Sequence, residues 1–418
     1  MVEMGNRVFI YCLGCEKRLL DAAKMRDFFI KNRYTIVYNP KRADYIIFIT
    51  CAFTKAVADS CIFEIKRFQR YDAELIVAGC LPAIESERLS HVFNGKTIVT
   101  KNIDDIDEIF PGGEIRFSDL NDANILFRNL DESKPRDRIL SNVLSYLNVE
   151  YAVRRIKKSI VRKMLGERTF LYFLLSSDEL FHMRVAWGCN NRCAYCGIRN
   201  AIGCFKSKPM VECLREFDSG LRKGYRNFVI TGDEVGCYGI DMGANLPMLI
   251  NEMLKRQGDY MISIRAVNPE WVIRYEEDLK HIMKSKRIFL FETPIQSKSH
   301  RILEMMHRYR DMDRLGEILQ DLRKLSPRTI FLTDYILGFP TETEEEMRET
   351  LEFLVDTFDC GYVMPFSPRP GTEAKNFEPK LSPEEIKRRV RYAKRFFRKS
   401  GYRVFTPENY FFIFDRKR

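Results

Sequence analysis

Three cysteines in the stretch WGCNNRCAYCGIRN constrain this chain more than any other feature. Cys189, Cys193 and Cys196 have the C-x3-C-x2-C spacing that holds a cubane iron–sulfur cluster by three thiolates. Three protein ligands leave one iron of a four-iron cluster open, so a substrate or cosubstrate can bind there. A zinc site is the alternative, but zinc prefers four ligands, and Cys204 is the nearest further thiol. The spacing therefore favours a [4Fe–4S] cluster.

Composition indicates a globular protein of a reducing compartment. The chain has 418 residues, 45% hydrophobic and 30% charged, which is enough for two or three domains. We expect a cytoplasmic protein without membrane association, because the first residues do not resemble a signal peptide and no apolar run is long enough to span a bilayer. Twelve cysteines then point to metal or redox chemistry rather than to disulfides. The formal charge of +11 favours an anionic partner, most simply RNA.

The first third of the chain alternates strand-like and helical segments, as in a parallel sheet covered by helices. We expect strands at Arg7–Tyr11, Tyr45–Thr50 and Glu74–Ala78, and helices at Arg18–Lys31 and Thr54–Arg70. The pattern predicts an α/β domain with a Rossmann- or flavodoxin-like parallel sheet over residues 1–120.

A second set of cysteines follows these strands. Cys15, Cys51 and Cys80 each lie just beyond one strand, and loops that leave the carboxyl ends of parallel strands converge on one edge of the sheet. Independent buried cysteines are the alternative, because free cysteine packs readily in protein cores. The shared topological position favours a second cluster, in which Cys12 replaces Cys15 if the strand register differs.

The rest of the chain divides into three predicted segments. Residues 121–182 read as a helical, basic linker, residues 183–382 as a partial (β/α)6 barrel of the TIM type, and residues 383–418 as a basic helix with a short tail. The reaction centre of such a barrel lies at the carboxyl ends of its strands. The expected barrel strands are Arg184–Trp187, Asn227–Thr231, Met261–Ile264, Arg287–Phe291, Thr329–Leu332 and Val363–Phe366. The expected helices are Met210–Lys223, Leu246–Arg256, Asp313–Leu325, Glu344–Phe358 and Pro383–Lys399.

From about Arg7 to Lys375 the chain resembles the radical S-adenosylmethionine methylthiotransferases, which modify tRNA adenosines or a ribosomal-protein aspartate. The segments CLGCEKRLLDAAKM, ITCAF and VAGCLP are similar to the family's amino-terminal cysteine motifs, and GCNNRCAYCGI to its radical motif. VNPEW, PIQSKSHRILEMMHR, TDYILGFPTETEEEM and FSPRPGTEAK follow in the family's order. TGDEVGCYGIDMGANLP is most similar to the subgroup that acts on threonylcarbamoyladenosine in tRNA.

The resemblance implies two [4Fe–4S] clusters and S-adenosylmethionine. Cys189, Cys193 and Cys196 would hold the radical cluster, where one electron from an external donor cleaves S-adenosylmethionine to methionine and a 5′-deoxyadenosyl radical. Cys15, Cys51 and Cys80 would hold the auxiliary cluster that carries the sulfur. A second S-adenosylmethionine would methylate that sulfur, and the radical would remove hydrogen from an unactivated carbon, which then receives the methylthio group.

Candidate cofactor contacts lie at the ends of the predicted barrel strands. Gly232, Asp233 and Glu234 follow the second strand, where carboxylates can meet a positively charged amino group. Asn268 and Gln296, at later strand ends, are candidate ribose or substrate contacts. Ser263 stands where relatives often carry arginine, and Arg265 projects from the same strand face two residues later.

The chain departs from the family pattern after the basic helix. Relatives usually end in a small RNA- or protein-gripping TRAM β-barrel, whereas Gly401–Arg418 is too short to form one. Two basic segments, Arg154–Lys163 and Lys387–Lys399, could neutralise phosphates, although a solvated helix explains the first equally well. Aromatic residues of the tail, among them Tyr402, Phe405 and Phe412, could stack on bases or pack the tail onto the barrel.

Three functions follow from these features. The first is methylthiolation of a tRNA adenosine of the threonylcarbamoyl type, and the second is methylthiolation of a peptide or protein side chain. The third is a non-catalytic iron–sulfur protein that binds RNA or senses redox state. A loop suited to a cosubstrate, Gly232–Glu234, and a second open cluster both favour an enzyme.

Overall fold

The computed structural model describes residues 5–127, 131–134, 180–408 and 411–416. The chain divides into two compact units, and each has its own sheet. Unit 1 comprises Met1–Lys163 and Gly197–Gly203, and unit 2 comprises Met164–Cys196 and Cys204–Arg418. The basic segment Arg154–Lys163 and most of the predicted linker lie outside the described residues. No helix among the described residues is long and apolar enough to cross a membrane.

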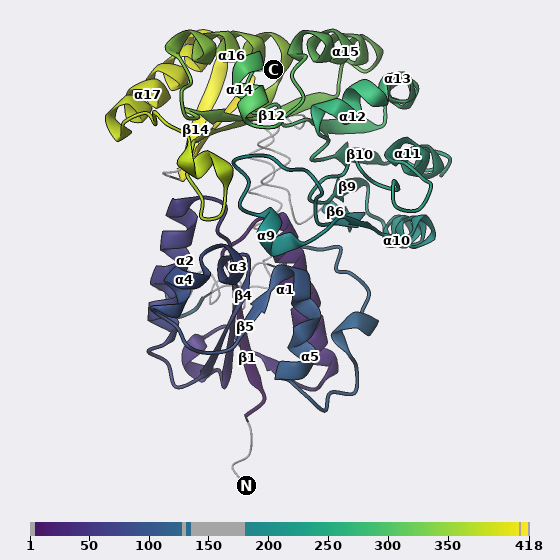
Figure 1. The fold of residues 1–418 in the computed structure, drawn as a ribbon. Coiled ribbons are helices and arrows are strands. Elements are labelled where there is room, and N and C mark those ends of the chain that lie inside the picture. Colours follow the sequence, from purple (N-terminus) through teal and green to yellow (C-terminus); the bar gives the residue numbers. More distant parts are fainter. Residues whose placement is uncertain (1–4, 128–130, 135–179, 409–410, 417–418) are drawn as a thin grey trace. The chain divides into compact units, whose positions relative to one another are not determined.

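Unit 1 is a five-stranded parallel sheet with helices on both faces (Figure 1). The strand order is β2-β1-β3-β4-β5, and every pair of neighbours is parallel. Its strands are β1 Arg7–Cys12, β2 Thr35–Ile36, β3 Tyr45–Thr50, β4 Glu74–Gly79 and β5 Thr97–Val99. Its helices are α1 Glu16–Lys31, α2 Lys55–Phe68, α3 Leu81–Ile84, α4 Ser86–Ser90, α5 Ile106–Ile109 and α9 Arg199–Ile202, with short 3-10 turns at Pro40–Arg42, Thr100–Asp105 and Phe117–Asp119.

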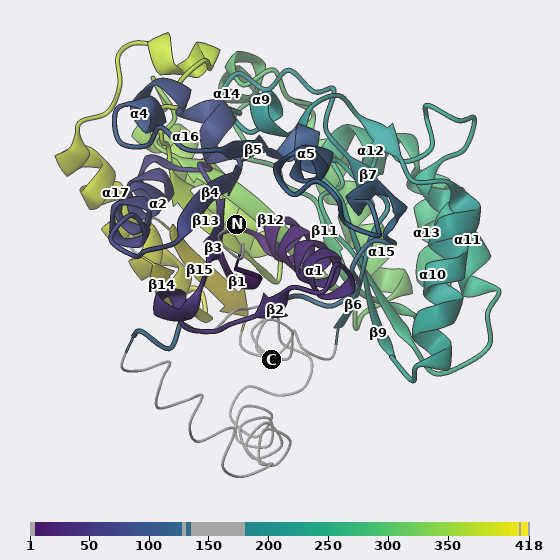
Figure 2. The ribbon, with the colours of Figure 1, turned by 90° about the horizontal axis from the view of Figure 1, so that it is seen from below.

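Alternation along the strands of unit 1 produces two separate cores. Phe9, Phe48 and Val77 point to the face covered by α2, α3 and α9. Ile10 and Ile47, one position away, point to the opposite face, where α1 and α5 pack. Figure 2 shows the sheet between these two helical layers. Burial on both faces explains why the strands read as continuous apolar runs.

Unit 2 is built on an eight-stranded sheet in the order β14-β15-β13-β12-β11-β10-β9-β6. The strands from β6 to β13 in this sheet run parallel to one another. Strand β15 pairs antiparallel with β13, and β14 pairs antiparallel with β15. The strands are β6 Leu180–Arg184, β9 Asn227–Thr231, β10 Met261–Ile264, β11 Ile288–Glu292, β12 Ile330–Leu337, β13 Cys360–Pro365, β14 Tyr402–Glu408 and β15 Phe411–Arg416. A separate two-stranded sheet pairs β7 Ala186–Trp187 with β8 Lys206–Ser207.

Helices connect the parallel strands of unit 2 and cover the outside of the sheet (Figure 1). They are α10 Met210–Arg222, α11 Leu246–Leu254, α12 Pro269–Arg274, α13 Glu276–Lys284, α14 His300–Met305, α15 Met312–Leu325, α16 Glu344–Thr357 and α17 Pro383–Lys399, with a 3-10 turn at Glu373–Asn376. Among the described residues the two outer strands of this sheet, β6 and β14, are not paired with each other, so the barrel is open. The predicted α/β fold with a partial barrel is confirmed.

The expected first barrel strand, Arg184–Trp187, is wrong. The strand that pairs with β9 is Leu180–Arg184, and Ala186–Trp187 belongs to the small β7–β8 sheet. His182 and Arg184 are buried although they are polar, so the hydrophobic pattern does not reveal the strand. The expected division into residues 1–120, 121–182, 183–382 and 383–418 stays a prediction.

The tail after α17 extends the sheet of unit 2. Strand β15 pairs antiparallel with β13, and β14 pairs with β15. Tyr402, Phe412 and Phe414 are buried there, and the Phe414 ring stacks on Phe397 of α17 with a centroid separation of 4.1 Å. The tail therefore packs onto the barrel and covers the edge of β13, which would otherwise be open to pairing with other chains.

Candidate functional site

In unit 1, Cys15, Cys51 and Cys80 occupy the carboxyl ends of three adjacent strands. Cys15 is the N-cap residue of α1, and Cys51 and Cys80 directly follow β3 and β4. Cys12 is the last residue of β1. None of the four forms a disulfide with a described residue, and Cys51 and Cys80 are buried, whereas Cys15 is exposed. The topology expected from the sequence is thus present.

The electrostatics of these thiols show that they are neighbours. Burial raises the pKa of Cys51, and negative charge on Cys15 and on Cys80 raises it further. Burial also raises the pKa of Cys12, with smaller contributions from Cys15 and Cys51. Bound iron would remove this penalty, because metal ligands are held as thiolates.

Close approach of β3 and β4 places Cys51 and Cys80 side by side. Gly79 pairs with Thr50 at the ends of these strands and has φ +103, and a Cβ added to it would lie 2.3 Å from the Thr50 carbonyl oxygen. Only glycine fits there without a shift of the backbone. The side-chain hydroxyl of Thr50 donates a 2.6 Å hydrogen bond to the Ala78 carbonyl and fixes the same corner.

Unit 2 carries the second set of thiols in the loop after β7. Cys189, Cys193 and Cys196 are each partly buried and unbonded to other cysteines. The Cys196 N–H donates to the Cys193 carbonyl at 3.1 Å, and the Asn191 N–H donates to Cys189 Sγ at 3.4 Å. Burial raises the pKa of Cys189 to about 12, with contributions from negative charge on Glu234, Cys193 and Cys196. These thiols are therefore close enough for charge on two of them to affect the third.

Neither set is arranged for a single metal ion. Among the described residues, no group of three or more His, Cys, Asp or Glu side chains could hold one. A single zinc ion needs every sulfur within about 2.3 Å, whereas a cubane cluster spreads its ligands over separate irons. The C-x3-C-x2-C spacing and the effects of Cys193 and Cys196 on the pKa of Cys189 fit a cluster in the loop of unit 2.

Two carboxylates connect the cysteine loop of unit 2 to the barrel. Asp233 Oδ2 accepts from the Gly188 N–H at 3.0 Å. Glu234 is 5% exposed; its Oε2 accepts from Asn191 Nδ2 at 3.0 Å and its Oε1 from the N–H groups of Gly236 and Asn268 at 3.1 and 3.2 Å. Burial raises the pKa of Glu234 to about 7, although these donors and Arg308 oppose the shift. The Gly232–Glu234 loop thus positions the cysteine loop through bonds within the protein.

Asn268 and Gln296 present buried acceptors that lack partners. Asn268 Oδ1 and Gln296 Oε1 have no hydrogen-bond partner among the described residues. Gln296 also has φ +69, an unusual conformation for a residue other than glycine. Buried polar atoms are nearly always hydrogen-bonded in native proteins, so these two oxygens are suited to donors of a bound ligand.

Arg265 belongs to a row of polar side chains on one face of the sheet. Its guanidinium donates to the Glu292 carboxylate at 2.7 and 3.3 Å. Burial raises the pKa of Tyr362. The positive charge of Arg265 lowers this pKa, and the negative charges of Glu292 and Asp334 raise it further, so the four groups interact across the ends of β10 to β13. The row lies beyond the apolar core formed by Leu290, Leu332 and Cys360, toward the carboxyl ends of the strands.

Sequence reasoning missed Arg308 and Asn191. Arg308 donates to Cys193 Sγ at 3.8 Å and to the Pro294 carbonyl at 2.6 Å. Burial alone would lower its pKa, but negative charge on Tyr195, Cys193 and Glu234 raises it. The sequence HRYR, with three basic residues just beyond α14, was the available signal. For Asn191 the signal was its place within the cysteine loop.

Comparison with known proteins agrees with this geometry. Residues 183–354 match the Radical SAM superfamily, and residues 7–100 match the Uncharacterized protein family UPF0004. A ribosomal protein uS12 methylthiotransferase RimO of Protochlamydia amoebophila is 27% identical over 91% of this chain and 74% of its own length. A probable threonylcarbamoyladenosine tRNA methylthiotransferase of Pyrococcus horikoshii is 26% identical over 89% of this chain and 79% of its own. The threonylcarbamoyladenosine tRNA methylthiotransferase MtaB of Aquifex aeolicus is 28% identical over 93% and 87%.

Solved structures show the same fold at low sequence identity. The radical S-adenosylmethionine methyltransferase TsrM from Kitasatospora setae, with tryptophan substrate and a SAM analog bound, has a TM-score of 0.59. It is 11% identical over 99% of this chain and 86% of its own. Membership of the radical S-adenosylmethionine methylthiotransferases implies an enzyme that uses two [4Fe–4S] clusters and S-adenosylmethionine, and this chain belongs to that family.

Proposed function

We propose that this enzyme transfers a methylthio group to an unactivated carbon of a tRNA adenosine of the threonylcarbamoyl type. The observation that carries the choice of RNA is the formal charge of +11, because a basic surface attracts polyanions. Relatives named as threonylcarbamoyladenosine tRNA methylthiotransferases match about nine-tenths of the chain, which agrees with this acceptor. An external electron donor and a cytoplasmic location belong to the same proposal.

We assign the ligand roles to the two sets of thiols. Cys189, Cys193 and Cys196 hold the radical cluster, and Cys15, Cys51 and Cys80 hold the auxiliary cluster. When bound, these groups and S-adenosylmethionine supply the one-electron chemistry and the sulfur that an unactivated C–H bond requires. The mutual charge effects among the thiols of each set support the assignment.

The residues of the chain itself position the reactants. Gly232, Asp233 and Glu234 fix the cysteine loop, and the free oxygens of Asn268 and Gln296 accept hydrogen bonds from the cosubstrate or substrate. Arg265 and its partner Glu292 form a rigid, charge-compensated edge beside them.

A protein acceptor is the second candidate. Several relatives at a similar identity are named as ribosomal protein uS12 methylthiotransferases, and the Protochlamydia enzyme matches 91% of this chain. We therefore keep a peptide or protein side chain as the alternative acceptor. The non-catalytic alternative is set aside, because the family consists of enzymes.

The test compares the two acceptors directly. The protein is reconstituted anaerobically with iron and sulfide, reduced, and incubated with S-adenosylmethionine and either threonylcarbamoyl-modified tRNA or a uS12 peptide. We expect methylthiolated nucleoside after digestion of the tRNA, and 5′-deoxyadenosine in both reactions. Methylthiolation of the peptide alone would overturn the RNA proposal, and absence of 5′-deoxyadenosine with both clusters loaded would overturn the assigned chemistry.

A further inference from the structure

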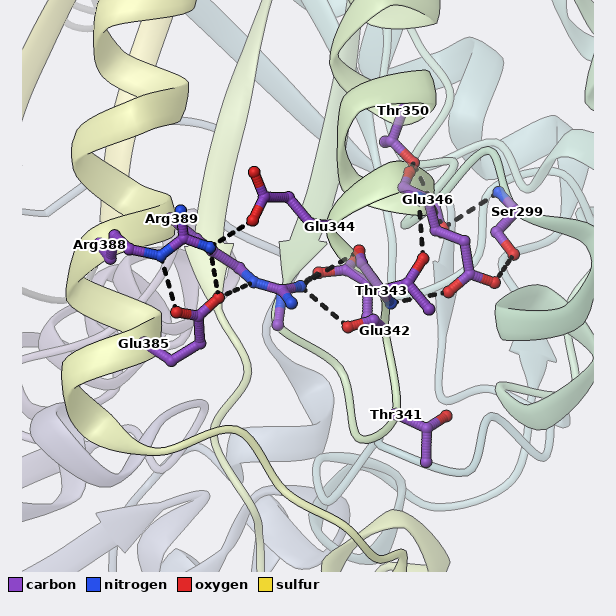
Figure 3. A network of polar contacts seen from close by, with 12 residues as sticks. Ser299, Thr341, Glu342, Thr343, Glu344, Glu346, Thr350, Glu385, Arg388 and Arg389 are labelled. Carbon is purple, nitrogen blue, oxygen red and sulfur yellow. Dashed lines mark hydrogen bonds and ion pairs between the residues drawn. The ribbon is translucent and has the colours of Figure 1, made fainter.

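Helix α17 is the most basic element that the structure describes. Eight cations lie within Lys387–Lys399, and they differ in what they contact. Arg388 donates to Glu385 at 2.8 Å and to Glu344 at 2.5 Å. Arg389 is 5% exposed and donates to Glu385 at 2.7 Å and to the carboxylate and carbonyl of Glu342 at 3.3 and 2.9 Å. Figure 3 shows both guanidinium groups held by these carboxylates.

Lys394 is also engaged. Its Nζ donates to Thr406 Oγ1 at 2.9 Å and lies over the Phe412 ring. Burial and the charge of Arg398 lower its pKa. Lys394 thus serves with Arg388 and Arg389 to attach α17 to its own unit, and these three cations are not available to a partner.

The remaining five cations form a stripe on the open side of the helix. The stripe consists of Lys387, Arg391, Arg395, Arg398 and Lys399, all exposed. None of the five side chains has a hydrogen bond or ion pair with another residue in the described part of the chain. The positions lie within about one third of the helix circumference and span about 18 Å along the axis. The buried residues Arg389, Ala393 and Phe397 occupy the opposite side.

Several cations that line a hollow elsewhere in unit 2 are, in contrast, paired with carboxylates. This hollow of about 770 Å³ is lined by four lysine or arginine residues, but Lys298 pairs with Asp313 at 2.6 Å, Arg301 with Glu346 at 2.7 Å and Arg310 with Glu304 at 2.6 Å. Carboxylates within the hollow would repel a polyanion. On α17 the only acidic residues, Glu384 and Glu385, lie in the first turn.

Resting on the proposed function, we infer that the α17 stripe binds the phosphate backbone of the substrate RNA. Evenly placed, unpaired cations along one helix face match a line of phosphates better than they match a folded protein surface, where acidic groups are scattered. Tyr392 and Phe396 lie along the border of the stripe with their rings nearly parallel, at 25°, and a centroid separation of 6.4 Å. Half-exposed aromatic rings beside cations are typical of surfaces that bind unpaired nucleotides.

The test measures the salt dependence of RNA binding. Full-length protein binds a labelled tRNA transcript in 50 to 200 mM KCl, in the wild type and in the variant Arg391→Gln/Arg395→Gln/Arg398→Gln. The binding constant K falls as the salt concentration rises, and each lost phosphate contact makes the negative slope of log K against log salt less steep by roughly 0.7 to 0.9. We expect a slope smaller by about 2 and binding weaker by about a hundredfold at 100 mM.

A matched control removes the same charge elsewhere. Arg222, Lys223 and Lys284 are exposed cations of α10, its C-cap and α13, and their side chains form no hydrogen bond or ion pair with another described residue. The variant Arg222→Gln/Lys223→Gln/Lys284→Gln should bind within about threefold of wild type. Unchanged thermal midpoints of both variants would show that the protein remains folded.

The outcomes separate the two proposals. If wild-type protein binds tRNA and the α17 variant binds equally tightly, or if both variants weaken binding to the same degree, the stripe is not the phosphate site. If wild-type protein does not bind tRNA but methylthiolates a uS12 peptide, the RNA acceptor itself is wrong.

Discussion

Arg308 places a permanent positive charge beside Cys193, one of the three cysteines that we propose as ligands of the radical cluster. Its guanidinium lies 3.8 Å from Cys193 Sγ and is fixed by the Pro294 carbonyl. Hydrogen bonds to the sulfur ligands and the net charge around a cluster set its reduction potential. A nearby cation stabilises the reduced, more negative state.

The variant Arg308→Met should therefore make the radical cluster harder to reduce. About 1.4 kcal/mol of lost differential stabilisation corresponds to about 59 mV for one electron, and we expect a decrease of this order. EPR-monitored redox titration of the reconstituted protein measures it. Arg308→Lys keeps the charge and should recover most of the potential, whereas equal potentials in wild type and Arg308→Met would contradict the role.

Glu346 at the start of α16 provides a prediction about acid stability. Its carboxylate accepts from Arg301, Ser299 and the Thr343 N–H, with distances of 2.7 to 3.0 Å, and forms a capping box with Thr343 (Figure 3). Burial would raise its pKa, but these donors outweigh burial and lower the pKa to about 2. Because the folded pKa lies below the unfolded value of 4.5, the carboxylate stabilises the fold above pH 4.5, and this contribution is lost as the pH falls toward 2.

Replacement Glu346→Gln should lower the free energy of unfolding at pH 6 by about 1 kcal/mol. We expect no larger loss, because the carboxylate is partly exposed and solvent screens its interactions. The difference from wild type should shrink at pH 3. Thermal unfolding at the two pH values measures it. Glu349→Gln, an exposed position of the same helix, removes an equal charge and should show no such convergence.

At the scale of elements, α17 and the terminal hairpin form one packed layer. Phe397 is fully buried and stacks on Phe414 at an interplanar angle of 8°, with Tyr402 and Phe412 at its edges. The Tyr402 hydroxyl also donates to the carbonyls of Val355 and Phe358 at the carboxyl end of α16, at 2.9 and 2.8 Å. The hairpin therefore depends on α17 for its core.

Phe397→Ala should cost about 3 to 5 kcal/mol, the usual penalty for removing a buried aromatic ring. A fall in the thermal unfolding midpoint of the barrel unit, followed by circular dichroism, measures this. The neighbouring ring of Phe396 is partly exposed, so Phe396→Ala should cost much less. Similar losses in the two variants would show that the hairpin does not rely on the Phe397–Phe414 stack.

The elements that sequence reasoning located are those with strong hydrophobic periodicity. The strand Tyr45–Thr50 and the helix Pro383–Lys399 were predicted with the bounds that the structure has. Short edge strands such as β2, with two residues, carry no pattern to read. The buried polar residues His182 and Arg184 interrupt the apolar pattern of β6 and hid that strand. The sequence indicates only a tail after α17, because β15 pairs with β13, which is distant in the sequence.

At the scale of the whole molecule, the two sets of cysteines belong to separately cored units. Cys51 lies in unit 1 and Cys193 in unit 2. Position after a strand led to the prediction of the set in unit 1, because parallel sheets gather their carboxyl ends at one edge, and the C-x3-C-x2-C spacing led to the prediction of the set in unit 2. Both ligand sets stay predictions. The contacts of Arg308, Asn191 and Glu292 depend on which loops meet in space, and a single sequence does not contain this information.

Separate cores predict that each set loads iron independently. Wild-type protein should bind roughly eight irons, and Cys51→Ser and Cys193→Ser roughly four each. Cys51→Ser should still form 5′-deoxyadenosine, and Cys193→Ser should not. Cys204→Ser, a substitution of an exposed thiol, should keep all eight irons; loss of iron there would revive the zinc alternative.

The residues of unit 1 are not contiguous in the chain, and this delays the completion of its fold while the chain is synthesised on the ribosome. Its sheet is complete at Val99, yet Ala201 of α9 packs into the core beside Leu81, the residue after Cys80. About a hundred residues separate β5 from α9, which corresponds to about 5 to 20 s of translation at 5–20 residues per second. During that interval the nascent domain exposes the apolar patch next to Cys80, so chaperones and cluster-assembly factors have a defined time in which to reach it.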